Sequence, residues 1–344
     1  MSRLRRVNPN GPGFHRVRHG KGFRYVDDGG HPVTEDLHLA RIAALVLPPA
    51  WEDVWICRTA NGHIQATGVD AAGRRQYRYH DQWRVTRDLA KHERILDFGA
   101  LLPRLRDRLC EDISADGMGR AKVLSCAVRL LDLGFFRVGS EQYQDSFGLA
   151  TLRKEHVSVS RDGVVTFDYT AKSGKHRVQS VAEPEVCTIV SALRRRRSGG
   201  EELLAYRDGT EWVDVRSADI NGHLHDLTGG DFTAKDFRTW NATVLAAVGL
   251  SVQQDVATVT ARKRAVARVT QEVAHYLGNT PAVCRASYID PRVIDLFESG
   301  TTIRPDLQRL GEDATPGAPA YQGRVEAAVL RLLRSEGAAA ARAG

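Results

Sequence analysis

Five polar residues, each near the predicted end of a helix or strand, are of the types that could carry out phosphoryl transfer. They are Arg137, Lys172, Arg238, Asn279 and Tyr288. A phosphodiester transition state carries negative charge on its nonbridging oxygens, and cationic side chains can stabilise that charge without a metal ion. Tyrosine is a competent covalent nucleophile. Taken alone, each residue is as typical of an ordinary surface or core position as of a catalytic one. The hypothesis therefore depends on the five lying together.

The segment GFFRVGSEQY places Arg137 between two predicted helices. Gly134 ends a helix predicted near residues 118–133, and Ser140 is a good N-cap for a second helix predicted over residues 140–153. The guanidinium and the N-terminus of the second helix could then bind the same anion.

Two lysines flank the turn of a predicted hairpin in the segment YTAKSGKHR. Either Lys172 or Lys175 could project beyond the sheet, and spacing alone does not choose between them. A phosphate-binding P-loop is excluded, because Tyr169 stands where its first glycine is required and His176 where Ser or Thr is required. We therefore expect no site for a nucleotide cofactor.

A pair of basic residues opens the predicted helix of the segment TAKDFRTWNATVLAAVGL. Thr233 is a natural N-cap, and Lys235 and Arg238 lie on one face of the first turns. Cations are disfavoured at a helix N-terminus, whose dipole end is positive. Their placement there makes sense if an anion binds.

Tyr288 is predicted in a short helix that follows Asn279. Thr280 is the predicted N-cap of this helix, Pro281 occupies its first position and Pro291 ends it. Tyr288 would then lie two turns into the helix.

The predicted elements divide the chain into two domains. Residues 1–88 contain short strand-like segments separated by Gly-rich turns, which is typical of a small strand-rich α+β domain. Residues 89–344 are mostly helical, with a meander through VSVS, VVTFDYT and HRVQSVA. We predict an α+β fold in which a small strand-rich N-terminal domain precedes a mainly α-helical catalytic domain with a three-stranded antiparallel sheet.

The net charge favours an anionic partner such as nucleic acid. The 344 residues include 49 Lys and Arg against 42 Asp and Glu, a formal net charge of +7, and the pI is about 9.3. Residues 1–90 hold 14 basic and nine acidic residues, a net of +5, whereas the other 254 hold 35 and 33, a net of +2. The basic excess therefore lies in the predicted N-terminal domain.

Composition excludes several other classes of protein. The apolar content of 42% is typical of a globular protein. No run of about 18 apolar residues predicts a membrane helix, and the basic N-terminus has no apolar core of the kind found in signal peptides. The five cysteines form no Cys-x-x-Cys pair, and the close histidines His223 and His225 lack further ligands nearby. We expect a cytoplasmic protein with no disulfide framework, metal or other cofactor.

Several segments resemble the type IB DNA topoisomerases, in particular the short bacterial and poxvirus-like form, both in their residues and in their order along the chain. They extend over most of residues 20–300: PPAWEDVWICRTANGHIQATGVDAAGRRQYRYH, FFRVGSEQY, TAKSGK, TAKDFRTWNA and LGNTPAVCRASYIDP. The resemblance implies a two-domain clamp on duplex DNA that nicks one strand, lets the free 5′ end rotate and reseals it, without ATP or metal. We expect a monomeric, nucleoid-associated enzyme.

The resemblance also assigns roles to the five polar residues. Arg137 and Arg238 would hold the scissile phosphate, Lys172 would be the general acid, and Tyr288 would form a 3′-phosphotyrosyl link. Many members of the family have histidine at the position of Asn279. The Asn279 amide can still donate a hydrogen bond but brings no charge.

Two alternatives remain open from the sequence. A tyrosine site-specific recombinase or integrase is similar in fold and in the order Arg, Lys, Arg, Tyr, but usually has histidine where this chain has Lys235. A non-catalytic DNA-binding protein on the same scaffold belongs to another class. Covalent trapping on DNA would separate an enzyme from a binding protein.

The predicted strand RRQYRYH is the candidate DNA-binding element of the N-terminal domain. By alternation, Gln76, Arg78 and His80 share a face opposite Tyr77 and Tyr79. We expect the polar face to contact base edges or phosphates while the tyrosines pack. The candidate DNA contacts, together with Lys235 in the catalytic domain, are Arg74, Arg75, Gln76, Arg78 and His80.

Overall fold

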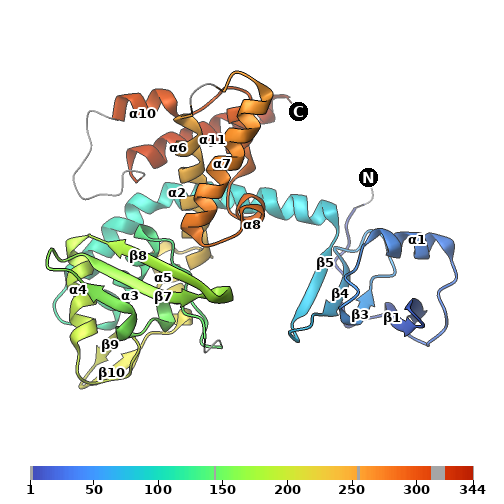
Figure 1. Cartoon of the computed structure of the whole chain (residues 1–344), viewed down its shortest axis with the longest axis horizontal. Coiled ribbons are helices and arrows are strands. Elements are labelled where there is room, and N and C mark those ends of the chain that lie inside the picture. The colour runs from blue at the N-terminus through green and yellow to red at the C-terminus, as the bar shows by residue number, and fades with distance from the viewer. Residues whose placement is uncertain (1–2, 143–144, 254–255, 311–321, 344) are drawn as a thin grey trace. The chain divides into compact units, whose positions relative to one another are not determined.

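A computed structural model describes residues 3–142, 145–253, 256–310 and 322–343 (Figure 1). The chain forms two compact units, Met1–Glu93 and Arg94–Gly344, each with its own apolar core. It passes from the first unit into the second within the long helix α2 (Asp81–Ser114). The structure is α+β, as predicted. Within the described ranges, no helix combines the length and the apolar character needed to cross a membrane.

The first unit is built on a five-stranded antiparallel sheet with the strand order β2-β1-β3-β4-β5. Its strands are β1 (Phe14–His19), β2 (Gly22–Asp27), β3 (Glu52–Ile56), β4 (Ile64–Val69) and β5 (Arg75–Tyr79). Helix α1 (Asp36–Ala44) buries Ile42 against the apolar side chains of the sheet, among them Phe14 and Ile56. Strand β5 is therefore an edge strand, and one of its sides is not paired within the sheet.

The second unit contains the predicted three-stranded meander, β6 (Val157–Val159), β7 (Val165–Ala171) and β8 (Lys175–Val181), in that order. Val165, Phe167 and Tyr169 alternate along β7 and are buried, so this face of the sheet packs on the helical core. The sheet leads to a tight turn at the 3-10 helix η3 (Lys172–Gly174). A separate hairpin pairs β9 (Ala205–Asp208) with β10 (Glu211–Asp214).

Helices form the rest of the second unit. They are α3 (Arg120–Leu133), α4 (Pro184–Arg195), α5 (Ser217–Thr228), α6 (Ala234–Ser251), α7 (Val259–Leu277), α8 (Pro281–Ser287), α9 (Pro291–Glu298), α10 (Arg304–Leu310) and α11 (Arg324–Ala343), with short 3-10 helices η1 (Leu149–Thr151) and η2 (Lys154–His156). Helix α6 is central, and its Trp240 is fully buried against Gly99 of α2, where a Cβ would approach the indole ring to 2.7 Å.

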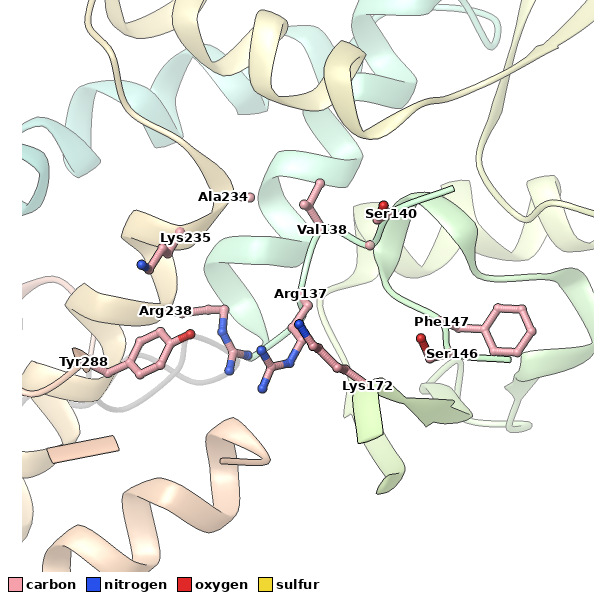
Figure 2. A pocket seen from close by; sticks show the side chains of 11 residues that line it. Arg137, Val138, Ser140, Ser146, Phe147, Lys172, Ala234, Lys235, Arg238 and Tyr288 are labelled. Atoms are coloured by element: carbon pink, nitrogen blue, oxygen red, sulfur yellow. The ribbon is translucent and has the colours of Figure 1, made fainter. Parts of the chain in front are cut away.

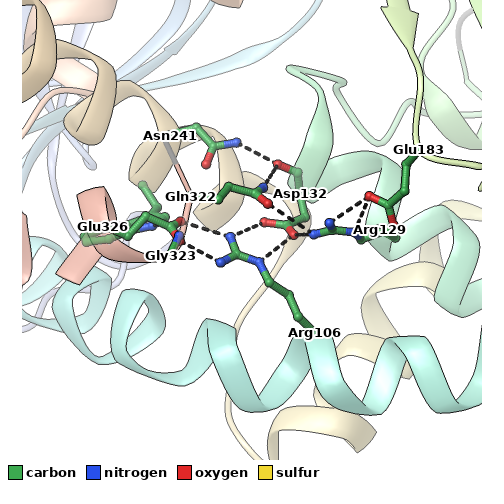
Figure 3. Close-up of polar contacts among 9 residues, drawn as sticks. Arg106, Arg129, Asp132, Glu183, Asn241, Gln322, Gly323 and Glu326 are labelled. Atoms are coloured by element: carbon green, nitrogen blue, oxygen red, sulfur yellow. Dashed lines mark hydrogen bonds and ion pairs between the residues drawn. The ribbon is translucent and has the colours of Figure 1, made fainter. Parts of the chain in front are cut away.

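A buried ion network joins four of these helices (Figure 3). Arg106 of α2 donates to both carboxylate oxygens of Asp132 on α3, each at 2.8 Å, and to Glu326 of α11 at 2.6 and 3.0 Å. Glu326 also accepts from the Trp240 indole at 2.8 Å, and the Asp132 carbonyl accepts from Asn241 at 3.3 Å. Removal of one partner from such a buried network typically costs about 3–5 kcal/mol, so the network fixes α6 relative to the end of α3.

Candidate active site

Four of the five predicted catalytic residues line one cavity of about 270 Å³, together with Lys235. Arg137 follows α3, Lys172 lies in the turn between β7 and β8, Arg238 belongs to α6 and Tyr288 follows α8. Figure 2 shows the two guanidinium groups close together, with the Tyr288 hydroxyl on one side and Lys172 on the other. Residues from four separate segments thus converge on one point.

Arg137 is held by its backbone, and the predicted helix over residues 140–153 is wrong. The described residues of that stretch form a turn, a bend and the 3-10 helix η1. The Arg137 carbonyl accepts from Leu149 N at 2.8 Å. Gly139 and Gly148 make this close approach possible, because a Cβ on Gly148 would lie 2.4 Å from the Cα of Gly139. A glycine contact, and not the N-terminus of an α-helix, therefore sets the position of Arg137.

The two hairpin lysines have different surroundings. Lys172 lines the cavity with Tyr288, and the turn is tight because Ser173 adopts a left-handed conformation with φ of 68°. Lys175 instead donates from Nζ to the carbonyl of Gly278 at 3.2 Å. The geometry favours Lys172 over Lys175 as the lysine that could reach a substrate in the cavity.

Arg238 is almost fully buried and anchored to two backbone carbonyls. Its Nη2 donates to Leu277 O at 2.8 Å and its Nη1 to Phe135 O. Among the described residues its Nε, also buried, has no hydrogen-bond partner. Burial and the nearby charge of Arg137 lower the pKa of Arg238 to about 10. The side chain is thus a fixed, crowded cation at the base of the cavity, and an anion placed there would relieve the repulsion.

Helix α6 also fixes the backbone of Tyr288. Thr280 caps α8 by accepting from Val283 N, as predicted, but the predicted end at Pro291 is wrong. Tyr288 ends α8, and Pro291 occupies the first position of α9, which proline suits. The Tyr288 carbonyl accepts from the Thr243 hydroxyl of α6 at 3.2 Å. Arg238, five residues before Thr243 on the same helix, has its guanidinium carbon 5.3 Å from the centroid of the Tyr288 ring. The tyrosine and the arginine are therefore positioned by one rigid element.

The positive charges around Tyr288 change its acidity. Burial raises the pKa of a tyrosine, but here Arg238, with contributions from Arg137 and Lys235, outweighs burial and lowers the pKa of Tyr288. A phenol with a lowered pKa loses its proton more readily and is a better nucleophile at neutral pH.

Asn279 reaches the site through Arg137 and does not line the cavity itself. Its Oδ1 accepts from Arg137 Nη2. Its Nδ2 is buried and, within the described part of the chain, has no hydrogen-bond partner. An unpaired buried donor is costly unless a ligand satisfies it, so the amide could donate to an oxygen of a bound phosphate.

The candidate DNA-binding strand exposes its tyrosine face to solvent, whereas we expected the polar face to be exposed. Tyr77 and Tyr79 are 45% and 36% exposed and their rings are stacked 6.0 Å apart, so the expectation that they pack is wrong. Gln76 and Arg78 alternate with them and are half-buried. Alternation separates the two faces of a strand but does not say which face the fold covers.

The polar residues of this strand are engaged by neighbours on the first unit. Arg74 and Gln76 both donate to Asp70, whose pKa falls to about 2 because of these and backbone hydrogen bonds. Arg78 pairs with Asp81 at 2.9 Å, and Arg75 donates to Asn10 at 3.3 Å. The ring of the fifth candidate in this region, His80, accepts from Gln82 N at 3.1 Å.

Nowhere in the described part of the chain do three or more His, Cys, Asp or Glu side chains gather in an arrangement that could hold a metal ion. The charged groups of the cavity are cations, which suit a phosphate and not a metal.

Comparison with known proteins agrees with this chemistry. Residues 80–303 match the family model of the eukaryotic DNA topoisomerase I catalytic core, and residues 22–70 match that of the bacterial DNA topoisomerase IB N-terminal domain. DNA topoisomerase 1B of Acanthamoeba polyphaga mimivirus is 30% identical over 300 residues, which cover 83% of this chain and 88% of the relative. DNA topoisomerase 1 alpha of Arabidopsis thaliana is 23% identical over 245 residues, 69% of this chain and 25% of the relative.

Proposed function

The chain belongs to the type IB DNA topoisomerases, and on that premise we propose that it relaxes supercoiled duplex DNA through a 3′-phosphotyrosyl intermediate. Membership in this family sets aside the tyrosine recombinase and the non-catalytic DNA-binding protein. The observation that carries the proposed mechanism is the convergence of Tyr288, Arg137, Lys172 and Arg238 on one cavity.

In the proposed cleavage step, Tyr288 Oη attacks the phosphorus and the bond to the 5′ oxygen breaks. The phenol proton is lost to solvent, and Lys172 donates a proton to the leaving 5′ oxygen. Arg137, Arg238 and the Asn279 amide stabilise the charge on the nonbridging oxygens. The products are a 3′-phosphotyrosyl ester and a free 5′ hydroxyl, and attack by that hydroxyl reverses the step.

Rotation of the free 5′ end between cleavage and resealing changes the linkage of the two strands. Torsional strain in the DNA drives the rotation, and the phosphotyrosine conserves the bond energy, so we propose that neither ATP nor a metal ion is needed. The N-terminal domain, residues 1–88, and Lys235 of α6 add noncovalent contacts to the duplex, and a monomer is sufficient.

Relaxation of supercoiled plasmid in EDTA without ATP tests this proposal. We expect the wild-type protein to relax both positive and negative supercoils. Tyr288→Phe should still bind DNA but form no denaturant-resistant DNA adduct. Tyr276→Phe is a matched control, because Tyr276 is an exposed tyrosine on α7. An adduct formed by Tyr288→Phe would mean that another residue is the nucleophile.

A substrate with sulfur in place of the 5′ bridging oxygen tests the role of Lys172. A thiolate leaves without a proton, whereas loss of a general acid on ordinary DNA costs about 10²–10⁴ in rate. Lys172→Ala should therefore be slow on ordinary DNA and close to wild type on the sulfur substrate. Arg137→Ala and Arg238→Ala should be slow on both. Sulfur rescue of Lys175→Ala instead would transfer the role to Lys175.

A further inference from the structure

One face of β8 carries three polar side chains that all bond to segments of the active site. Alternation places Lys175, Arg177 and Gln179 on this face. Lys175 donates to Gly278 O at 3.2 Å, and Gln179 accepts from Phe135 N at 3.1 Å. The hairpin that ends in Lys172 is therefore attached by β8 to the backbone beside both Asn279 and Arg137.

Arg177, at the centre of this face, makes the most extensive attachment. Its guanidinium donates to His275 O at 3.0 Å and to Tyr276 O at 2.5 Å, both in the last turn of α7. Carbonyls at a helix C-terminus have no partner within the helix, and a cation there is favoured by the helix dipole. The side chain is also packed closely, because a Cβ on Gly278 would lie 3.3 Å from its Cδ.

This attachment links the predicted acid to the phosphate-binding residues. Arg177 pairs with Tyr169 across the hairpin, close to the turn that holds Lys172. On the other side, α7 ends at Gly278, and Asn279 follows and bonds to Arg137. Arg177 lines the same narrow cleft as Lys172, Arg137 and Arg238.

We propose that Arg177 is a positioning residue that holds Lys172 at the 5′ oxygen by fastening the hairpin to the end of α7. This inference rests on the proposed function, since it takes Lys172 as the general acid. Lys172 lies at the tip of a tight turn, so its distance from Asn279 depends on how the hairpin is attached. Misplacement of a catalytic group by about 1 Å can cost 10²-fold in rate.

Single-turnover cleavage of ordinary and 5′-sulfur DNA distinguishes this role from a direct or a purely structural one. We expect Arg177→Ala to slow cleavage of ordinary DNA by roughly 10- to 100-fold, and to be close to wild type on the sulfur substrate. The double variant Lys172→Ala/Arg177→Ala should be no slower than Lys172→Ala, because both changes remove the same proton transfer. Val178→Ala, an exposed position on the opposite face of β8, should match wild type on both.

Other results would overturn the inference. Wild-type rates for Arg177→Ala on ordinary DNA, equal slowing on both substrates, or additive effects in the double variant would each do so. If Arg177→Ala fails to fold, Arg177→Lys, which keeps one donor for the carbonyls, should show a smaller defect that sulfur also rescues. Failure of wild type to form an adduct, or of sulfur to rescue Lys172→Ala, would overturn the proposed chemistry as well. Failure at Arg177 alone would leave that chemistry intact.

Discussion

Asn279 is the residue at which this chain departs from many members of its family. Its carbonyl oxygen is occupied by Arg137, which leaves the amide group as the donor toward a phosphate. We expect Asn279→Ala to slow cleavage by roughly 10- to 1,000-fold, the range for one transition-state hydrogen bond, and Asn279→His to be tolerated. Single-turnover rates measure both. Asn279→Asp, which keeps the shape but loses the donor, should be as slow as the alanine variant. Equal rates for Asn279→Ala and wild type would remove the residue from the site.

The lowered pKa of Tyr288 predicts a pH dependence. The reactive form is the phenolate, so the cleavage rate should rise with pH and level off below the pH expected for an ordinary tyrosine, whose pKa is about 10. The 5′-sulfur substrate isolates this effect, because it does not depend on the protonation of Lys172. Lys235→Ala removes one cation that lowers this pKa, so its rate profile should move to higher pH. Identical profiles for the variant and wild type would contradict this electrostatic account.

At the scale of elements, the end of α7 has a requirement for glycine that can be tested. Gly278 has φ of 62° and faces Arg177, so Gly278→Ala would strain the backbone and push on that side chain. Gly229, at the end of α5, has φ of 64° and no atom within 4 Å of its added Cβ, which makes Gly229→Ala a matched control. We expect both variants to lose about 1 kcal/mol of stability in denaturant unfolding, but only Gly278→Ala to cleave DNA more slowly. Equal cleavage rates for the two glycine variants would show that the end of α7 does not influence the site.

Helix ends were the most predictable elements, because their signals are local. Thr233 and Thr280 begin α6 and α8, and Gly134 follows the end of α3, as the sequence indicates. The helix predicted over residues 140–153 failed for the opposite reason. Its geometry depends on a contact between Gly139 and Gly148, and no periodicity within the segment reveals such a contact.

The site was predictable in its residue types but not in its supports. The order of the motifs identified Arg137, Lys172, Arg238 and Tyr288, and the fold brings them together. Arg177 was missed, since an arginine in an alternating strand is equally typical of a solvated face. Its role becomes visible only when β8 lies against the end of α7.

At the scale of the whole molecule, charged side chains have different roles in the two units. In the second unit they pair inside the core, where Arg106, Asp132 and Glu326 join α2, α3 and α11 (Figure 3). Residues 1–90 instead carry most of the net positive charge. That division is consistent with a catalytic unit whose charges set geometry and an N-terminal unit whose charges attract DNA.

Variants of the edge strand β5 can distinguish the electrostatic attraction of DNA from contacts that particular side chains make with it. Each lost phosphate contact lowers the slope of log affinity against log salt by about 0.9. Alanine at Arg74, Arg75 and Arg78 should therefore weaken binding and flatten the slope, although Arg74 and Arg78 also pair with carboxylates. The exposed pair Tyr77 and Tyr79 carries no charge, so alanine at both should weaken binding with the slope unchanged.

Binding of a DNA duplex across a range of KCl concentrations measures both effects, in a Tyr288→Phe background so that only noncovalent binding is recorded. The two sets of variants serve as controls for each other, because they alter the same strand and differ in charge. In a chain that keeps Tyr288, religation by a preformed covalent complex of the arginine variant should change far less than its binding, since the second unit holds the reacting groups. An unchanged slope for the arginine variant would show that these side chains keep their partners within the protein and do not contact phosphate. A flattened slope for the tyrosine variant would mean that the aromatic pair acts by orienting the neighbouring cations.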